Sequence, residues 1–269
     1  MSSTPLPQGR RPKPPPRPVE VVAVENVAPR MVSVTFGGEA LRGFAQPAPT
    51  AHIKVMFPDA SGELVIPEAG PDGGALWPEG YRPIMRTYTP LRYDAEANRL
   101  EVWFVDHGEG LASSWAMSAK VGDRAAIGGP GGRFQLDPSV RHYWIGGDES
   151  ALPAVAMLLE ALPESATAEV HLEVAGPDDE IGAMPTHAGA TVVWHHRQPR
   201  AWGAELEKSL AASELFAGTH VWVAGEASSI RRMRSHLLTE RGLDRTSFTT
   251  RGYWRLGEAN HPDHDYGDD

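Results

Sequence analysis

The stretch Arg86-Thr87-Tyr88-Thr89-Pro90 is the most informative short motif in this 269-residue chain. Alternate side chains of an extended strand share a face, so Arg86 and Tyr88 are expected to be neighbours on one side. Pro90 then ends the regular pattern, because proline has no N–H to donate to a sheet. A guanidinium beside a phenol ring suits a ligand that is part anion and part flat aromatic ring. The alternative is an ordinary edge strand with a solvated arginine, because short motifs also arise by chance.

Length and composition narrow the class of protein. The chain can form one large or two ordinary domains, and its 41% hydrophobic residues can build a substantial core. A formal net charge of −10 argues against nucleic-acid or acidic-membrane partners but permits a local basic pocket. The absence of cysteine excludes disulfides, thiolate metal sites and Fe–S clusters held by this chain. With neither a signal-peptide core nor a membrane-length apolar run, we expect a soluble, cytoplasmic protein with no membrane partner. No sequence feature reports the oligomeric state, and a monomer is the expectation.

The first half of the chain has the alternating pattern of β-strands. We expect a Pro-rich disordered tail over residues 1–17 and a β domain over residues 18–138, with a Gly- and Pro-rich excursion at 58–82. Lys54 stands in the middle of the strand predicted at 52–57. It is either a solvent-facing lysine on a barrel wall or an anion receptor in a cleft.

Two Gly-rich segments of this domain could approach a ligand. Gly108-Glu109-Gly110 precedes a helix predicted over 111–120, whose free N–H groups, with the hydroxyls of Ser113 and Ser114, would suit a pyrophosphate. Many helices without ligands begin in the same way, and the third glycine of the dinucleotide fingerprint is missing. The second segment, residues 128–133, could admit a ligand or a neighbouring strand, or could simply join two domains.

The second half alternates strands with helices, which predicts a parallel α/β domain over residues 139–257. Ligands of such sheets bind beyond the carboxyl ends of the strands, here residues 147–150, 175–176 and 224–226. The aromatic and basic segment 249–257 is expected to pack back onto the body, and residues 258–269 to form an acidic disordered tail. The arginines near the sheet ends are either ligands of a ribose 2′-phosphate or plain surface: Arg197, Arg200, Arg231 and Arg232.

Taken in order, these motifs resemble the siderophore-interacting proteins, which are FAD-containing ferric-siderophore reductases of the ferredoxin reductase superfamily. The resemblance covers about residues 19–257 and rests on nine short segments: 52–58, 86–89, 104–108, 112–116, 121–123, 128–131, 147–154, 224–226 and 252–257. It implies a six-stranded antiparallel FAD-binding β-barrel, followed by a parallel α/β domain that binds NADPH or NADH.

The resemblance also implies roles for individual residues. The FAD ligands would be Arg86, Thr87, Tyr88, Thr89, His107, Ala112, Ser113, Ser114 and Trp115. Ser150, where the family usually has threonine, would be the catalytic residue near the reactive edge of the flavin. Asp148, Gly225 and Glu226 would serve the nicotinamide side, and Lys54, Arg133 and Arg255 would form a basic receptor for an anionic ferric siderophore. No metal ligands are expected.

Two positions depart from the family pattern. Leu91 stands where the family often has an arginine, which puts one flavin or substrate contact in doubt, and Leu111 replaces a proline in the turn before the helix. The expected function is FAD-dependent reduction of ferric siderophores with release of Fe(II) in the cytoplasm, with NAD(P)H or a reduced ferredoxin as donor. The alternatives are a flavin reductase that serves another acceptor, and a flavin- or siderophore-binding carrier without turnover.

Overall fold

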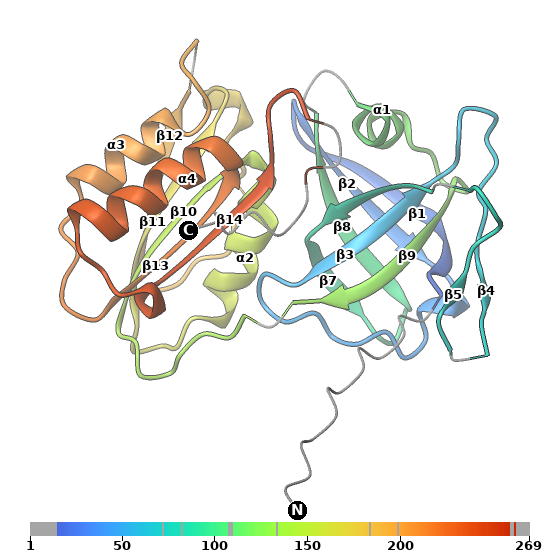
Figure 1. The fold of residues 1–269 in the computed structure, drawn as a ribbon, viewed down its shortest axis with the longest axis horizontal. Coiled ribbons are helices and arrows are strands. Elements are labelled where there is room, and N and C mark those ends of the chain that lie inside the picture. The colour runs from blue at the N-terminus through green and yellow to red at the C-terminus, as the bar shows by residue number, and fades with distance from the viewer. Residues whose placement is uncertain are drawn as a thin grey trace, which may run out of the picture.

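Two sheets lie side by side in the computed structural model, which describes residues 15–71, 73–81, 83–106, 110–132, 134–182, 184–197, 199–258 and 261 (Figure 1). The first half of the chain forms a rolled antiparallel sheet, here called the barrel, and the second half forms a parallel sheet covered by helices, the α/β domain. The chain crosses from one to the other between Gly131 and His142.

The barrel has seven strands in the order β6-β3-β9-β1-β2-β8-β7. Their bounds are β1 Arg17–Ala28, β2 Met31–Gly37, β3 His52–Phe57, β6 Ile84–Tyr88, β7 Pro90–Asp94, β8 Arg99–Val105 and β9 Arg124–Gly131. The two end strands are consecutive in the chain and β6 also lies near β8, so the sheet is rolled up with β6 and β7 as its edge strands. The resemblance implied six strands, and the seventh is β7. Pro90, which was expected to end the regular pattern, instead begins this strand, which pairs with β8.

Apolar side chains fill the barrel, and helix α1 (Leu111–Ser118) covers one end of it (Figure 1). Phe36, Phe57 and Phe104 form the centre of this core together with the indole of Trp115 from α1. In the described residues of the excursion at 58–82, the regular structure is a small ladder, β4 (Glu68–Ala69) with β5 (Ala75–Leu76). The alternating strand pattern therefore predicts this half well.

The α/β domain has five parallel strands in the order β12-β11-β10-β13-β14. Their bounds are β10 His142–Asp148, β11 Thr167–Val174, β12 Ala190–His196, β13 Thr219–Glu226 and β14 Phe248–Trp254. Helix α2 (Leu152–Ala161) packs on one face, together with Ile145 and Trp222. Helices α3 (Ala204–Ala212) and α4 (Ala227–Ser235) pack on the other face, together with Trp144 and Val223.

Three local predictions are corrected by the structure. The segment expected only to pack back is the strand β14, paired with β13. Serine is a common helix cap, so the sequence predicts that Ser150 and Ser228 cap the helices that follow them. Instead, Asp148 caps a short 3-10 turn after β10 by accepting from the Ser150 N–H, and Glu226 accepts from the Ser229 N–H at the start of α4. In both places a carboxylate, which accepts hydrogen bonds more strongly than a hydroxyl, precedes the expected serine.

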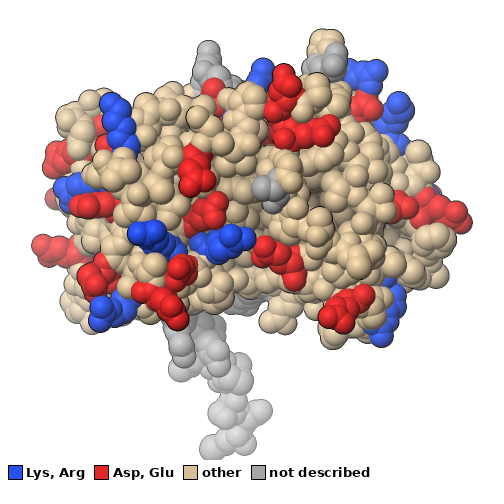
Figure 2. All heavy atoms as spheres, turned by 180° about the vertical axis from the view of Figure 1, so that it is seen from behind, with Lys and Arg blue, Asp and Glu red and all other residues tan. Residues whose placement is uncertain are grey.

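The barrel and the α/β domain share one apolar cluster. Met31 and Trp103 of the barrel pack with Ala151 and Leu152 of the α/β domain, and Leu91 lies against the same cluster. On the face seen in Figure 2, acidic and basic side chains are interspersed rather than gathered in one field. Among the residues that the structure describes, no helix has the length and apolar composition needed to cross a lipid bilayer.

Candidate functional site

The Arg86-Thr87-Tyr88-Thr89 stretch is the edge strand β6 and the bend that follows it. Arg86 pairs with Val55 and Tyr88 with Ile53 on β3, which places both side chains on one face, as predicted. The Arg86 guanidinium donates to the Met85 carbonyl at 2.8 Å. The Tyr88 ring lies 4.4 Å from that of Phe104, and burial raises the pKa of its phenol. Tyr88 therefore offers a neutral ring and an O–H donor.

Lys54 lies next to this stretch but on the other face of the strand pair. Its partner in the register is Thr87, and its ammonium donates to the Thr87 hydroxyl. The structure thus brings Lys54 to the predicted flavin motif, while the β3–β6 pair separates it from Arg86 and Tyr88.

The start of helix α1 is suited to an anion. Gly110 precedes the helix without a side-chain cap, so the first N–H groups have no acceptor within the helix. The Ser113 hydroxyl donates to Asp106 at 2.9 Å, and Ser114 is exposed. The side chains of Ala112 and Trp115 face the barrel core. What this helix can offer a pyrophosphate is therefore its backbone N–H groups and the Ser114 hydroxyl. His107 lies outside the described residues.

The glycines of β9 serve strand pairing. A Cβ at Gly129 would lie 3.2 Å from the His52 carbonyl oxygen, and one at Gly132 would lie 3.2 Å from the Ala51 Cα. A Cβ at Gly131 would lie 2.6 Å from the His52 ring. Of the alternatives left open by the sequence, close approach of a neighbouring strand is the one observed. Arg133 lies outside the described residues.

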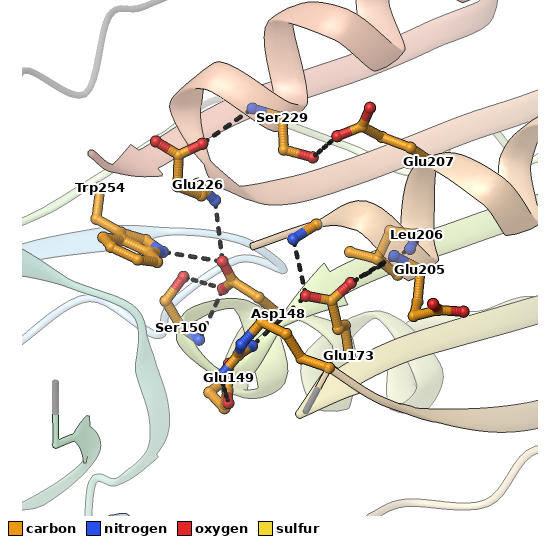
Figure 3. A network of polar contacts seen from close by, with 12 residues as sticks. Asp148, Glu149, Ser150, Glu173, Glu205, Leu206, Glu207, Glu226, Ser229 and Trp254 are labelled. Carbon is orange, nitrogen blue, oxygen red and sulfur yellow. Dashed lines mark hydrogen bonds and ion pairs between the residues drawn. The ribbon is translucent and has the colours of Figure 1, made fainter. Parts of the chain in front are cut away.

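A buried carboxylate, Asp148, joins the carboxyl ends of three strands of the α/β domain (Figure 3). Its Oδ1 accepts from the Ser150 N–H at 2.9 Å and from the Ser150 hydroxyl at 2.5 Å. Its Oδ2 accepts from the Glu226 N–H at 2.9 Å and from the Trp254 indole N–H at 2.8 Å. Burial, with the neighbouring Glu149 carboxylate, raises the pKa of Asp148 to about 7 against the lowering effect of these hydrogen bonds.

Gly225 and Glu226 complete this end of β13. Gly225 has φ +156°, and a Cβ there would lie 2.6 Å from Asp148 Oδ2, so only glycine fits. The buried Glu226 carboxylate accepts from the Ser229 N–H at 2.9 Å and from the Leu256 N–H at 3.4 Å. Asp148, Ser150, Gly225 and Glu226 are thus brought together as predicted, but the two carboxylates have protein donors as partners.

A second buried ionic group lies beside the first and was not predicted. Arg197 forms two hydrogen bonds with Glu149, at 2.8 and 3.1 Å, and lies 3.5 Å from Glu173. Glu173 also accepts from the Gly203 and Glu205 N–H groups at the start of α3, at 2.7 and 2.9 Å. Burial raises the pKa of Glu173. The sequence carries no clear signal of it, because Glu173 continues the alternation of polar Glu169 and His171 with apolar residues in the strand Thr167–Val174.

Two more of the four arginines considered for a 2′-phosphate, Arg200 and Arg232, also have carboxylate partners. Arg200 contacts Glu205, and Arg232 contacts Glu207 through two guanidinium nitrogens. Arg197 is buried, with its guanidinium 3.3 Å from the centre of the Trp202 ring. A phosphate would have to compete with these carboxylates, so the geometry does not single out any of the three as a nucleotide ligand.

Arg255 and Leu91 complete the predicted set. Arg255 follows β14 and lies 3.3 Å from the Glu258 carboxylate, while 37% of its side chain stays exposed. Leu91 packs against the apolar cluster shared by the two domains, and Arg92 instead faces Glu160 at 3.4 Å. Leu91 therefore has a packing role at the position where the family often has an arginine.

Comparisons with known proteins agree with this architecture. Family models described as the siderophore-interacting FAD-binding domain and the siderophore-interacting protein match residues 20–134 and 140–257. The chain is 33% identical to the ferric vibriobactin reductase ViuB of Vibrio cholerae, over 93% of both chains. It is 31% identical to the NADPH-dependent ferric-chelate reductase of Escherichia coli, over 88% of this chain and 92% of the relative. The crystal structure of a siderophore utilization protein from T. fusca superposes with a TM-score of 0.84 and 37% identity, over 93% of this chain and 96% of the other.

Proposed function

Because the chain belongs to the siderophore-interacting protein family, we propose that it reduces ferric siderophores and releases their iron as Fe(II) in the cytoplasm. It is an NAD(P)H-dependent flavin oxidoreductase with FAD as its flavin. One observation carries the proposal: relatives named as ferric-chelate reductases match this chain across nearly the whole length of both proteins. Hard oxygen ligands hold Fe(II) far more weakly than Fe(III), so reduction is itself a means of release.

The barrel residues would hold the flavin. Its phosphates suit the uncapped N-terminus of α1 with Ser114, and its ring suits the strand edge that carries Arg86 and Tyr88. The family resemblance assigns six further residues to this site: Thr87, Thr89, His107, Ala112, Ser113 and Trp115. When bound, FAD accepts a hydride equivalent and passes on single electrons, which links a two-electron donor to a one-electron acceptor.

The α/β domain would receive the nicotinamide beyond the carboxyl ends of β10 and β13. Ser150, Asp148, Gly225 and Glu226 lie there, linked by the hydrogen bonds of the Asp148 carboxylate. In this proposal Ser150, the half-exposed member of the group, touches the reacting edge. The buried Asp148 and Glu226 carboxylates shape the backbone around it.

Lys54 and Arg255 would receive the anionic chelate, together with Arg133. Each described cation is held by its own domain, Lys54 by Thr87 and Arg255 by Glu258. Local positive charge on a chain of net charge −10 attracts an anion to one place. Iron reduction requires no general acid, so the chain contributes binding and orientation. In this proposal the protein acts as a monomer, and a reduced ferredoxin is the alternative donor.

Anaerobic spectroscopy of the FAD-loaded protein tests the proposal. The flavin absorbance should bleach with NADH or NADPH and recover when an anionic ferric siderophore is added. Recovery only with other acceptors would favour a general flavin reductase, and a flavin that does not bleach would favour a carrier.

A charge-removal experiment tests the receptor. In Lys54→Ala, Arg255→Ala, the KM for an anionic ferric siderophore should rise about tenfold, while FAD content and bleaching stay unchanged. The control Arg42→Ala, Arg99→Ala removes two exposed positive charges elsewhere and should leave the KM near that of the wild type. Equal kinetics of the wild type and the Lys54, Arg255 variant would refute the receptor.

A further inference from the structure

A short turn follows β14 and carries Arg255. In this turn, residues 255–258, the Glu258 N–H donates to the Arg255 carbonyl at 3.1 Å, and Gly257 has φ +79°. The Leu256 side chain is 66% exposed. In Figure 1 the chain beyond β14 turns toward the barrel. We call residues 255–258 the C-terminal arm. A turn with so exposed a side chain needs other contacts to hold it in one place.

The first such contact comes from Trp254, directly before the arm. Its indole N–H donates to Asp148 Oδ2 at 2.8 Å, across 106 residues of sequence (Figure 3). Its ring meets that of Trp202 edge to face, with centres 4.6 Å apart. Trp202 in turn lies under the Arg197 guanidinium, which Glu149 holds. Trp254 is therefore fixed both by a polar contact and by packing.

The acceptor of this contact is itself immobile. Asp148 is 1% exposed and receives four donors, from Ser150, Glu226 and Trp254. The missing side chain of Gly225 leaves the space that the carboxylate needs. A buried carboxylate that gains four donors has one favourable orientation, so the Trp254 N–H has one favourable position.

A second contact reaches the arm itself. The Leu256 N–H donates to Glu226 Oε1 at 3.4 Å, and the other oxygen of that carboxylate accepts from the Ser229 N–H at 2.9 Å. Glu226 is buried and joined to Asp148 through its own N–H. Arg255 is thus flanked by two residues, Trp254 and Leu256, that are tied to two linked carboxylates.

We propose that Asp148, Glu226 and Trp254 are positioning residues that hold the C-terminal arm so that Arg255 meets an anionic ferric chelate. The proposal rests on the function proposed above, in which Arg255 belongs to the receptor. Trp254 acts through Arg255 and does not touch the reacting atoms. Loss of its N–H should weaken capture of the chelate and leave electron delivery from NAD(P)H unchanged.

The test is the Trp254→Phe variant, which keeps a ring against Trp202 and removes only the donor. The dissociation constant for a negatively charged ferric tris-catecholate is measured on the oxidised, FAD-loaded protein by titration calorimetry without NAD(P)H. It should rise about tenfold, which is the loss expected for one hydrogen bond to a charged acceptor. The KM for the same chelate should rise by a similar factor, while kcat stays within about twofold of the wild-type value. The affinity for a neutral ferric tris-hydroxamate should stay unchanged.

Trp144→Phe is the matched control. The Trp144 indole N–H donates to the Ser213 hydroxyl at 2.9 Å in the same domain, on the sheet face covered by α3 and α4. This variant loses the same kind of donor and should bind the tris-catecholate as the wild type does. A melting temperature and FAD content measured for both variants separate loss of fold from loss of the arm position.

A double-mutant cycle with Arg255→Ala decides the outcome. If Trp254 acts through Arg255, the Trp254→Phe, Arg255→Ala variant binds the chelate no worse than Arg255→Ala alone. Additive losses, or a Trp254→Phe variant that binds like the wild type, would overturn the positioning role while leaving the reductase function intact. A wild-type protein that neither binds nor reduces ferric chelates would instead overturn the proposed function.

Discussion

The barrel and the α/β domain bury polar groups of different kinds. In the described part of the barrel, the buried polar groups are hydroxyls and an indole N–H, from Ser33, Thr89, Tyr93, Trp103 and Ser113. The α/β domain buries ionisable groups, all at the carboxyl ends of its strands or in the loop just beyond one of them: Asp148, Glu149, Glu173, Arg197 and Glu226. The barrel places Lys54 and Arg86 by strand register over an apolar core, whereas the α/β domain places its site by a network of charges.

This difference has consequences for tolerance to substitution. An apolar core accepts exchanges that keep its volume, because the contacts are many and individually weak. A buried charge network accepts few, because removal of one partner leaves the other without compensation. The α/β edge should therefore be the more brittle of the two regions, although its strands and helices are as regular as those of the barrel.

The largest loss of stability is expected when Arg197 is replaced. Arg197→Ala leaves the Glu149 and Glu173 carboxylates buried without their positively charged partner, and should lower the free energy of unfolding by about 3–5 kcal/mol. Urea unfolding followed by circular dichroism measures it. Arg232→Ala is the control, because its partner Glu207 is also held by two guanidinium nitrogens but the pair is much more exposed, and it should lose less than about 1 kcal/mol. Equal losses in the two variants would contradict the assigned role of burial.

The next largest difference in stability is expected between two substitutions that preserve side-chain size, one in each domain. Glu149→Gln keeps the shape of the side chain but removes the charge that faces Arg197, and should cost about 1.5–3 kcal/mol. Leu100→Met keeps the volume of a fully buried barrel residue and should cost less than about 1.5 kcal/mol. The reverse order, measured by urea unfolding of both variants, would mean that the two regions do not differ as described.

Sequence patterns predicted the strands better than the polar network, for a physical reason. Alternation of apolar residues is local, so β3 at His52–Phe57 matches its prediction, and β10 ends at Asp148, within the strand end expected at 147–150. β14 was missed as a strand because Arg251 and Gly252 interrupt its apolar pattern, and because it is recognised only through its pairing with β13. The Asp148 carboxylate accepts hydrogen bonds from residues 150, 226 and 254. The last two are so far from Asp148 in the sequence that no local pattern predicts these contacts.

The same reasoning explains the mixed outcome for single site residues. The grouping of Asp148, Ser150, Gly225 and Glu226 followed from the rule that strand ends meet at one edge of a parallel sheet. The pairing of Lys54 with Thr87 depends on register, which the motif alone does not reveal. The roles of His107 and Arg133 stay predictions, since both lie outside the described residues.

A third prediction concerns the response of the α/β domain to acid. Burial, with the neighbouring His195, lowers the pKa of His171 to about 4 from an ordinary value of 6.5. Between these values the unfolded chain binds a proton that the folded protein does not, so stability is lost as the pH falls through this range. Between pH 7 and 5 the His171 contribution should fall by roughly 2 kcal/mol.

A comparison with His171→Gln isolates this contribution. The raised pKa of Asp148 acts in the opposite direction, because the folded protein takes up that proton as the pH falls from about 7. Asp148 is present in both proteins, so its effect cancels when the free energy of unfolding of the variant is subtracted from that of the wild type. This difference should decrease by about 2 kcal/mol from pH 7 to pH 5. A difference that is the same at both pH values would show that His171 does not titrate as described.

The smallest effect is a change in affinity for an anionic ferric chelate, expected on the C-terminal arm, where the polar network reaches the surface. Arg255 lies 3.3 Å from the half-exposed Glu258 carboxylate, which competes with an incoming anion for the same guanidinium. Glu258→Gln should therefore tighten binding of an anionic ferric chelate by about two- to fivefold, the range of an exposed ion pair. Glu160→Gln, which removes the partner of Arg92 in another exposed pair, changes the net charge equally and should have no effect. Weaker binding by the Glu258 variant would mean that the ion pair holds Arg255 in its receiving position, and that the α/β domain uses charge pairing for placement even at its surface.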